Sequence, residues 1–96
     1  MKTLKKITVR PVVVEYIPDP ENMVQDEIYI SVKYKTAVHL CLCGCGNLSV
    51  THFMDDSGWR VILRANTGLT ITPSILNTNC PNRYHYIITD NIASVV

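Results

Sequence analysis

The stretch that decides the fold is IYISVKY, residues 28–34. Apolar and polar side chains alternate through it, so that Ile28, Ile30, Val32 and Tyr34 fall on one face. A two-residue period is typical of a β-strand that is buried on one side only. We therefore predict a half-buried strand here, and the segments on either side of it follow the same pattern.

Six further segments, separated by residues that favour turns, have the composition of short strands: 7–17, 48–53, 59–65, 69–72, 84–88 and 92–96. Pro11 removes one donor from a β-ladder, so its segment is expected to be an edge strand or to contain a bulge. Gly68 is expected to take a positive φ in the turn that it ends. Apolar residues at helical spacing extend no further than about one turn, at residues 22–27. The sequence predicts an all-β domain of about seven short, mostly antiparallel strands in a small sandwich or partly open barrel.

Composition narrows the class of protein. The chain has 96 residues, of which 47% are hydrophobic and 18% charged, so residues 1–96 can form one small domain with its own core. The net charge of +1 argues against nucleic acid or an anionic membrane as the partner. No apolar segment is long enough for a signal sequence or a membrane span. We expect a cytoplasmic protein with reduced thiols.

Three cysteines occupy alternate positions in HLCLCGCG, residues 39–46, and Cys80 is the one other cysteine. Alternate residues of a strand have Cα atoms about 7 Å apart, at the outer limit for a disulfide. A metal ion explains the pattern better, because Gly44 and Gly46 let the backbone turn around an ion that neighbouring thiolates hold. Soft thiolate and imidazole ligands select zinc over magnesium or calcium. The sequence thus predicts a zinc knuckle, with free buried cysteines as the alternative.

Six residues are candidate ligands, which is more than a four-coordinate ion accepts. The favoured ligands are Cys43, Cys45, Cys80 and His85, and Cys41 comes next. His39 is expected to orient a ligand through a hydrogen bond or to bond to the backbone. Four protein ligands would make the site structural, whereas three ligands and a water would make it catalytic.

The remaining polar residues receive simpler interpretations. His52 is expected to be a surface histidine or one with its hydrogen bonds satisfied, and Asp55 and Asp56 are expected to form a turn. Ser74 and His85 offer a nucleophile and a base, but no third member and no G-x-S-x-G motif accompanies them. Trp59 is expected to anchor the core.

Several segments of the chain match the pattern of a known family: Tyr29 to Ser31, Ala37 to Gly46, Val50 and Thr51, Trp59, Leu69 to Ile75, and His85 to Ile88. Through them the chain resembles the bacterial and phage protein family DUF6527 over about residues 12–96. Members of that family are treated as metal-binding proteins, and some are encoded beside bacterial ubiquitin-like conjugation components, including an E1-like adenylating enzyme. The resemblance implies an accessory role in a bacterial ubiquitin-like modification or phage-defence context.

Two functions of different classes follow from these observations. The favoured one is a small, non-enzymatic, zinc-binding adaptor that binds a protein partner, such as a component of a ubiquitin-like pathway. It is favoured because no well-formed set of acid, base and nucleophile lies outside the expected zinc ligands. The alternative is a zinc-dependent hydrolase or a cysteine thiol-transfer enzyme, in which Cys41, Cys43 or Cys45 acts as the nucleophile.

Overall fold

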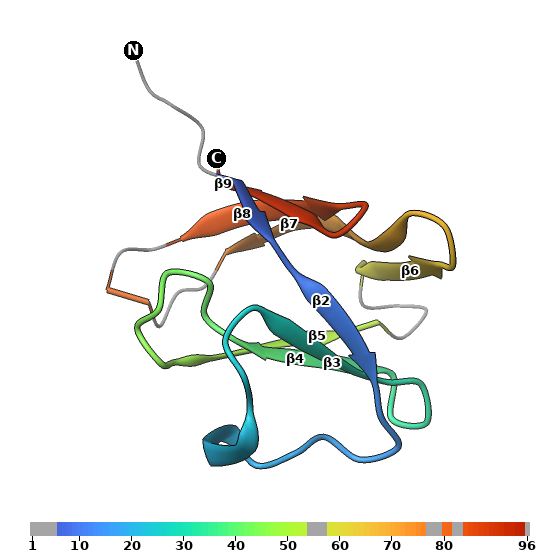
Figure 1. The fold of residues 1–96 in the computed structure, drawn as a ribbon, viewed down its shortest axis with the longest axis horizontal. Helices are drawn as coiled ribbons and strands as arrows, with labels where there is room; N and C mark the ends of the chain where they lie inside the picture. Colours follow the sequence, from blue (N-terminus) through green and yellow to red (C-terminus); the bar gives the residue numbers. More distant parts are fainter. Residues whose placement is uncertain (1–5, 54–57, 77–79, 82–83, 96) are drawn as a thin grey trace.

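The computed structural model describes residues 6–53, 58–76, 80–81 and 84–95, and it consists of two β-sheets that face each other (Figure 1). The sheets form an open sandwich and do not close into a barrel. The strands of the five-stranded sheet, in spatial order, are β1 (Lys6–Thr8), β9 (Ile92–Val95), β8 (His85–Thr89), β7 (Gly68–Leu76) and β6 (Arg60–Arg64). Those of the four-stranded sheet are β2 (Arg10–Val13), β3 (Glu27–Ser31), β4 (Thr36–Leu40) and β5 (Leu48–His52).

The all-β prediction is confirmed, with two more strands in the described residues than expected. The segment 7–17 divides at Val9, which is 2% exposed, and its halves join different sheets. β1 runs antiparallel to β9, whereas β2 runs parallel to β3 and is an edge strand, as Pro11 indicated. The second additional strand is β4, which precedes the cysteine-rich loop. One turn of 3-10 helix, η1 (Pro20–Asn22), lies just before the segment where a helical turn was predicted.

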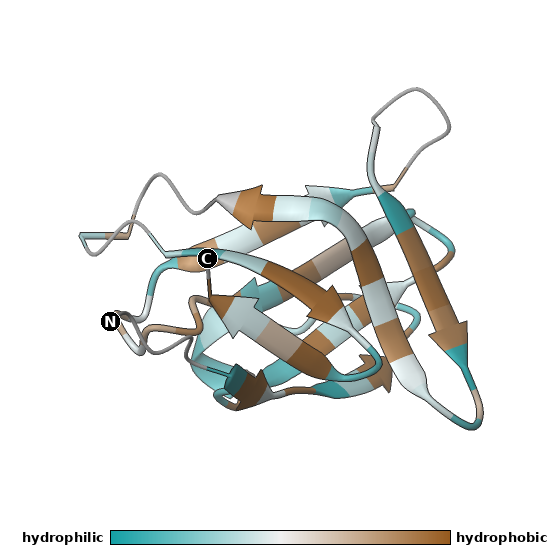
Figure 2. Cartoon of the chain, turned by 90° about the horizontal axis from the view of Figure 1, so that it is seen from above, coloured by the Kyte–Doolittle hydropathy of each residue, from teal (hydrophilic) through white to brown (hydrophobic). Residues whose placement is uncertain are grey.

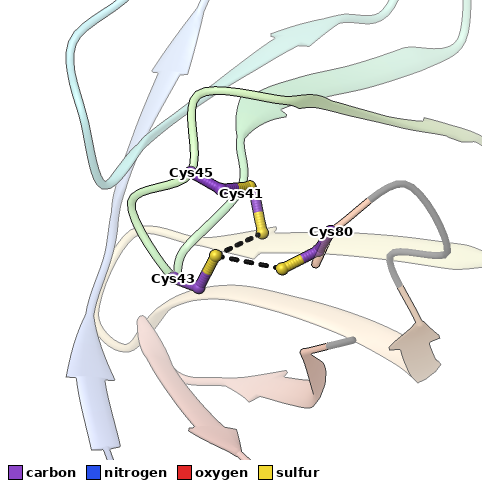
Figure 3. Close-up of side chains that lie close together, drawn as sticks. All are labelled: Cys41, Cys43, Cys45 and Cys80. Carbon is purple, nitrogen blue, oxygen red and sulfur yellow. Dashed lines mark hydrogen bonds between the residues drawn. The ribbon is translucent and has the colours of Figure 1, made fainter. Parts of the chain in front are cut away.

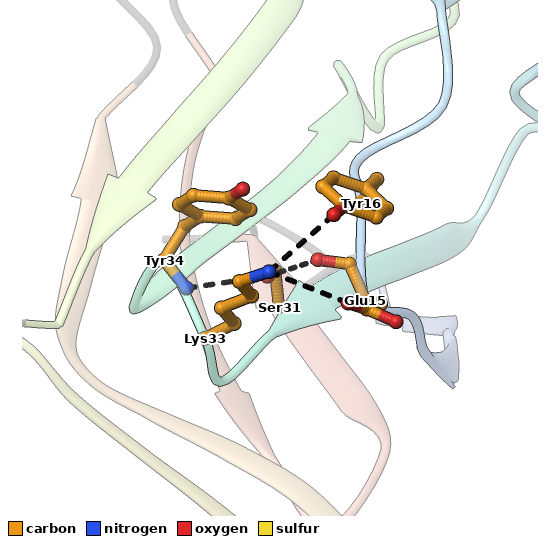
Figure 4. A network of polar contacts seen from close by, with 5 residues as sticks. All are labelled: Glu15, Tyr16, Ser31, Lys33 and Tyr34. Carbon is orange, nitrogen blue, oxygen red and sulfur yellow. Dashed lines mark hydrogen bonds and ion pairs between the residues drawn. The ribbon is translucent and has the colours of Figure 1, made fainter.

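The strand predicted for residues 28–34 is shorter and more deeply buried than its alternation suggested. β3 is buried along its whole length and ends at Ser31, after which the chain turns, with Lys35 at a φ of 51°. Val32 and Tyr34 are therefore exposed in the turn that leads to β4. The Nζ of Lys33 lies 5.0 Å from the ring centroid of Tyr16 and 5.5 Å from that of Tyr34 there, and 3.3 Å from the carboxylate of Glu15 (Figure 4).

The main core lies between the two sheets. Its residues alternate along the strands with outward-facing ones, and Trp59 packs against it from one side, as expected. Fully burying one large aliphatic side chain stabilises the fold by about 1.5–3 kcal/mol. The largest buried side chains of this core are Tyr86, Ile28, Leu69, Ile71 and Ile88.

β7 is longer than the four residues predicted for it, because it continues through Pro73 to Leu76. Gly68 begins it with a φ of 93°, so the positive φ expected at this residue is present. Between Ile71 and Ile75 the pairing with β8 shifts register, and the Thr72–Pro73 peptide bond there is cis. The turn expected at residues 54–57 and most of the loop at 77–83 lie outside the described residues. No helix in the described part of the chain has the length and apolar character of a membrane span.

Candidate functional site

The four cysteines come together at one end of the sandwich (Figure 3). Cys41, Cys43 and Cys45 lie in the loop between β4 and β5, and Cys80 lies in the connection between β7 and β8. Their four Sγ atoms are all within 4.8 Å of one another. The Sγ of Cys43 lies 3.0 Å from that of Cys80 and 3.5 Å from that of Cys41. The four cysteines form no disulfide with one another.

The loop that carries three of these thiols turns tightly because of its glycines. Gly44 and Gly46 have φ values of 88° and 85°, which side chains other than hydrogen disfavour. The N–H of Gly44 donates to the carbonyl of Cys41 over 3.0 Å, and the N–H of Cys41 donates to the carbonyl of Asn47 over 2.8 Å. The loop therefore closes on itself and directs its sulfur atoms toward Cys80, as a knuckle does.

The donor set fits a metal ion. Tetrahedral zinc with Zn–S bonds of about 2.3 Å places its sulfur atoms about 3.8 Å apart, within the range that this cluster spans. Cys41 and Cys80 are buried, and Cys43 and Cys45 are partly buried. The pKa of the Cys43 thiol is raised, chiefly by its hydrogen bond with Cys80. Four thiolates this close would repel one another, so deprotonation of the cluster requires a cation.

His39 lies outside this group of four cysteines. Its Nε2 is 2.5 Å from the hydroxyl of Tyr86, and its buried Nδ1 has no hydrogen-bond partner among the described residues. Burial lowers the pKa of His39 to about 4, so the ring is neutral at neutral pH. Burial also raises the pKa of Tyr86, a hydrogen bond with the Ser49 side chain lowers it, and the charges of Cys41, Cys80 and Cys43 raise it. His39 and Tyr86 thus form a buried support beside the thiols.

His85, the other histidine expected at the metal, also lies outside the group and contacts Ser74 instead. Its Nε2 is 2.5 Å from the Oγ of Ser74, and both side chains are half-buried. Among the described residues, Ser74 is the one hydrogen-bond partner of His85, and no carboxylate lies within ion-pair distance of it. Asp55 and Asp56, expected to form a turn, lie outside the described residues.

The register of β7 and β8 explains why Ser74 reaches His85. Tyr86 pairs with Ile75, and His85 pairs with Leu76. Because side chains alternate along a strand, the buried Ile75 and Tyr86 face the core while Ser74 and His85 face outward. A diagonal pair on one face of an antiparallel ladder is close enough for side-chain contact. The register shift before Ile75 is what moves Ser74 into this diagonal position.

β8 connects the two groups of residues. It begins five residues after Cys80 and presents His85 on its outer face and Tyr86 on its inner face. The cysteine cluster therefore holds the segment that leads directly to the histidine of the Ser74–His85 pair. His52, by contrast, is exposed on β5, with its Nδ1 3.5 Å from the Oγ1 of Thr36.

Sequence reasoning dismissed Ser74 and His85 as a nucleophile and base, because neither a third member nor a motif accompanied them. The sequence does contain one indication of this pair. Ser74 precedes the apolar Ile75 and His85 precedes the apolar Tyr86, so alternation along a strand places both polar side chains on the face opposite the core. What the sequence does not contain is the register that makes the two polar residues neighbours.

The family comparison gives one match, which covers most of the chain. Residues 13–96 match the family model BubE, described as bacterial ubiquitination-like system serine protease. The match agrees with the bacterial ubiquitin-like context that the resemblance implied, under a family name other than DUF6527. No curated protein and no solved structure shows a significant match.

Proposed function

The chain belongs to the bacterial ubiquitination-like system serine protease family, BubE, and from this premise we propose that it is a serine protease. Ser74 is the nucleophile and His85 is the general base in this proposal. The observation that carries it is the 2.5 Å contact between the Oγ of Ser74 and the Nε2 of His85 on an accessible face of the sheet. A nucleophile and a base within hydrogen-bond distance are the minimum that acyl transfer needs.

The chemistry follows from the two atoms in contact. His85 Nε2 accepts the proton of Ser74 as Oγ attacks the carbonyl carbon of the substrate, which gives a tetrahedral oxyanion. Collapse of this species breaks the C–N bond, and the leaving amine takes the proton from His85, which leaves an ester on Ser74. Water then attacks the ester while His85 accepts its proton, and the returning proton restores the Ser74 hydroxyl as the acid product leaves.

The position of His85 is set by the fold. In many serine proteases a carboxylate orients the histidine, and no described carboxylate does so here. The pairing of β7 with β8 limits the orientation of His85 in part, because His85 pairs with Leu76 and is followed by the fully buried Tyr86. A side chain next to a buried residue in a paired strand has few orientations available.

A zinc ion held by the four cysteines is the second part of the proposal. Cys41 takes the place that the sequence assigned to His85, since His85 is engaged by Ser74. When bound, the ion supplies a cross-link between the β4–β5 loop and the connection that leads into β8. Its role is structural, because four thiolates complete the usual coordination of zinc.

The substrate is a protein of the same ubiquitination-like system. A protease of such a system cleaves a peptide or isopeptide bond formed with the ubiquitin-like protein, so the expected protein partner becomes the substrate. A non-enzymatic adaptor would need neither Ser74 nor His85 and would keep its function when both are replaced.

The direct test uses the ubiquitin-like protein of the same system, fused through its C-terminus to a fluorescent reporter. Ser74→Ala is expected to lower kcat/KM for cleavage by about a hundredfold or more. Thr36→Ala is the matched control, because Thr36 carries a half-buried hydroxyl on β4 of the four-stranded sheet and has no role in the chemistry. Cleavage by Ser74→Ala at the rate of the unchanged protein would contradict the proposal.

A further inference from the structure

The Ser74–His85 pair lies on the outer face of the five-stranded sheet, which no described strand of the other sheet covers (Figure 2). We propose that this outer face docks the protein substrate, and that it selects a substrate whose contact surface has carboxylates around an apolar centre. The inference rests on the proposed function for the identity of the partner. The docking itself is argued from charge, exposure and register.

The strand register places the relevant side chains on one surface. Ala93 is fully buried and pairs with Ile88, so their neighbours Ile87 and Ser94, which also pair, face outward. Lys6 pairs with Ser94 from the other side and continues the row. These outward residues share the face of Ser74 and His85, since Ile87 is two residues from His85 on the same strand.

β6 adds its outward residues at the opposite edge of this face. Val61 and Leu63 pair with the buried Ile71 and Leu69, so the alternate residues of β6 face outward. Those outward residues are Arg60, Ile62 and Arg64. Arg60 pairs with Thr72, two residues before Ser74, so a positive charge lies close to the reactive pair.

Charge on this face is of one sign. Lys6, Arg60 and Arg64 are exposed, and none of them forms an ion pair with a described carboxylate. The described strands of this sheet contain no Asp or Glu, and Asp90 lies in the turn between β8 and β9. In the four-stranded half, Arg10 pairs with Glu27 and Lys33 with Glu15. Although the net charge of the chain is only +1, the charges are unevenly distributed, and this face is basic. A basic face attracts an acidic partner.

The centre of the same face is apolar. Ile87, on the middle strand β8, is 38% exposed, and threonines of β7 and β8 lie near it. Ile62, which is 39% exposed, adds an apolar side chain between Arg60 and Arg64 on the edge strand β6. An apolar centre within a polar and charged rim is the usual anatomy of a protein–protein interface. The described face carries no exposed aromatic side chain on which a nucleic-acid base would stack, which favours a protein over a nucleic acid.

The experiment measures binding in the Ser74→Ala background, so that no cleavage intervenes. The probe is the ubiquitin-like protein of the same system, titrated by calorimetry at low and at moderate salt. Adding Arg60→Glu and Arg64→Glu is expected to raise Kd about tenfold or more at low salt, and by less as salt screens the charges. The matched control replaces Lys33 and Lys35, which lie in the β3–β4 turn, with Glu and is expected to leave Kd unchanged.

The outcomes separate this inference from the proposed function. Equal Kd values with and without the two Arg→Glu changes would overturn the docking surface, even if Ser74 proves essential for cleavage. Binding of a short single-stranded oligonucleotide that depends on Arg60 and Arg64, with no binding of the protein probe, would also overturn it. Charge-dependent binding of the protein probe supports docking whether or not Ser74 cleaves, and the cleavage assay alone decides the role of Ser74.

Discussion

The Oγ of Ser74 is 2.5 Å from the Nε2 of His85, across two antiparallel strands whose pairing shifts register between Ile71 and Ile75. The contact depends on the side chains pointing away from the core, since Ile75 and Tyr86 beside them point into it. The sheet thus brings together two residues that are eleven apart in the sequence and leaves them accessible to a large substrate.

The first prediction concerns His85. His85→Gln removes the base, so kcat is expected to fall by about a hundredfold or more. The midpoint of thermal unfolding should change little, because the side chain is half-buried and faces outward. Cleavage assays and thermal scans of His85→Gln and of the exposed-histidine control His52→Gln check both statements. A full rate for His85→Gln would show that the contact with Ser74 has no part in catalysis.

The second prediction concerns the cysteine cluster. The purified, reduced protein is expected to contain one zinc ion per chain, and Cys43→Ser is expected to lose both the ion and the folded state. The reason is that the binding free energy of a structural ion in so small a domain is folding free energy. Elemental analysis and circular dichroism measure the two losses. Ser94→Ala, on β9, is the control and should retain zinc.

One result for Cys43→Ser would contradict the metal site. A Cys43→Ser protein that remains folded and is as stable as the unchanged chain would identify the four thiols as ordinary core cysteines. That outcome would restore the alternative of free buried cysteines, which the sequence left open.

The third prediction concerns the buried support beside the thiols. Tyr86→Phe removes the hydroxyl that contacts His39 and leaves that ring without its hydrogen bond in an apolar environment. The free energy of unfolding is expected to fall by about 1–3 kcal/mol. Tyr34→Phe is the control, because Tyr34 is 51% exposed, and its change should be close to zero. Chemical denaturation of both variants gives the comparison, and equal stabilities would refute the role of the Tyr86 hydroxyl.

The fourth prediction uses two glycines with similar backbone conformations. Gly68 and Gly58 have φ values of 93° and 87°, so Ala is strained at either position. A Cβ on Gly68 would lie 2.1–2.3 Å from side-chain atoms of Asn91, whereas one on Gly58 would have no such atom within 4 Å. Gly68→Ala is expected to cost about 2 kcal/mol or more, and Gly58→Ala about 1 kcal/mol. Similar losses for the two would show that the Asn91 side chain moves aside freely.

The alternation of apolar and polar residues was sufficient to predict most strands, because that pattern is a property of each segment alone. β4 was missed because its residues, Thr36–Leu40, run directly into the cysteine motif, and the segment was interpreted as part of a metal knuckle. The division of segment 7–17 at Val9 was not visible either. Nothing in a continuous run of β-branched residues shows that its two halves join different sheets.

The candidate site was predictable only where its parts are local. Three thiols and two glycines within residues 39–46 indicated a knuckle without any knowledge of the fold. Whether Cys41 or His85 is the fourth metal ligand depends on which face of β8 turns toward the cysteine-rich loop between β4 and β5. The contact of Ser74 with His85 depends in addition on a register shift within β7. Both are relations between strands, and a single sequence does not specify them.

The most direct test of the central claim is intact-mass spectrometry of the protein after treatment with a fluorophosphonate probe, followed by peptide mapping. The account predicts one covalent adduct on the Oγ of Ser74, with strong loss of labelling in His85→Gln because the base is missing. An unlabelled protein, or a Ser74→Ala variant that labels as fast as the unchanged chain, would contradict it.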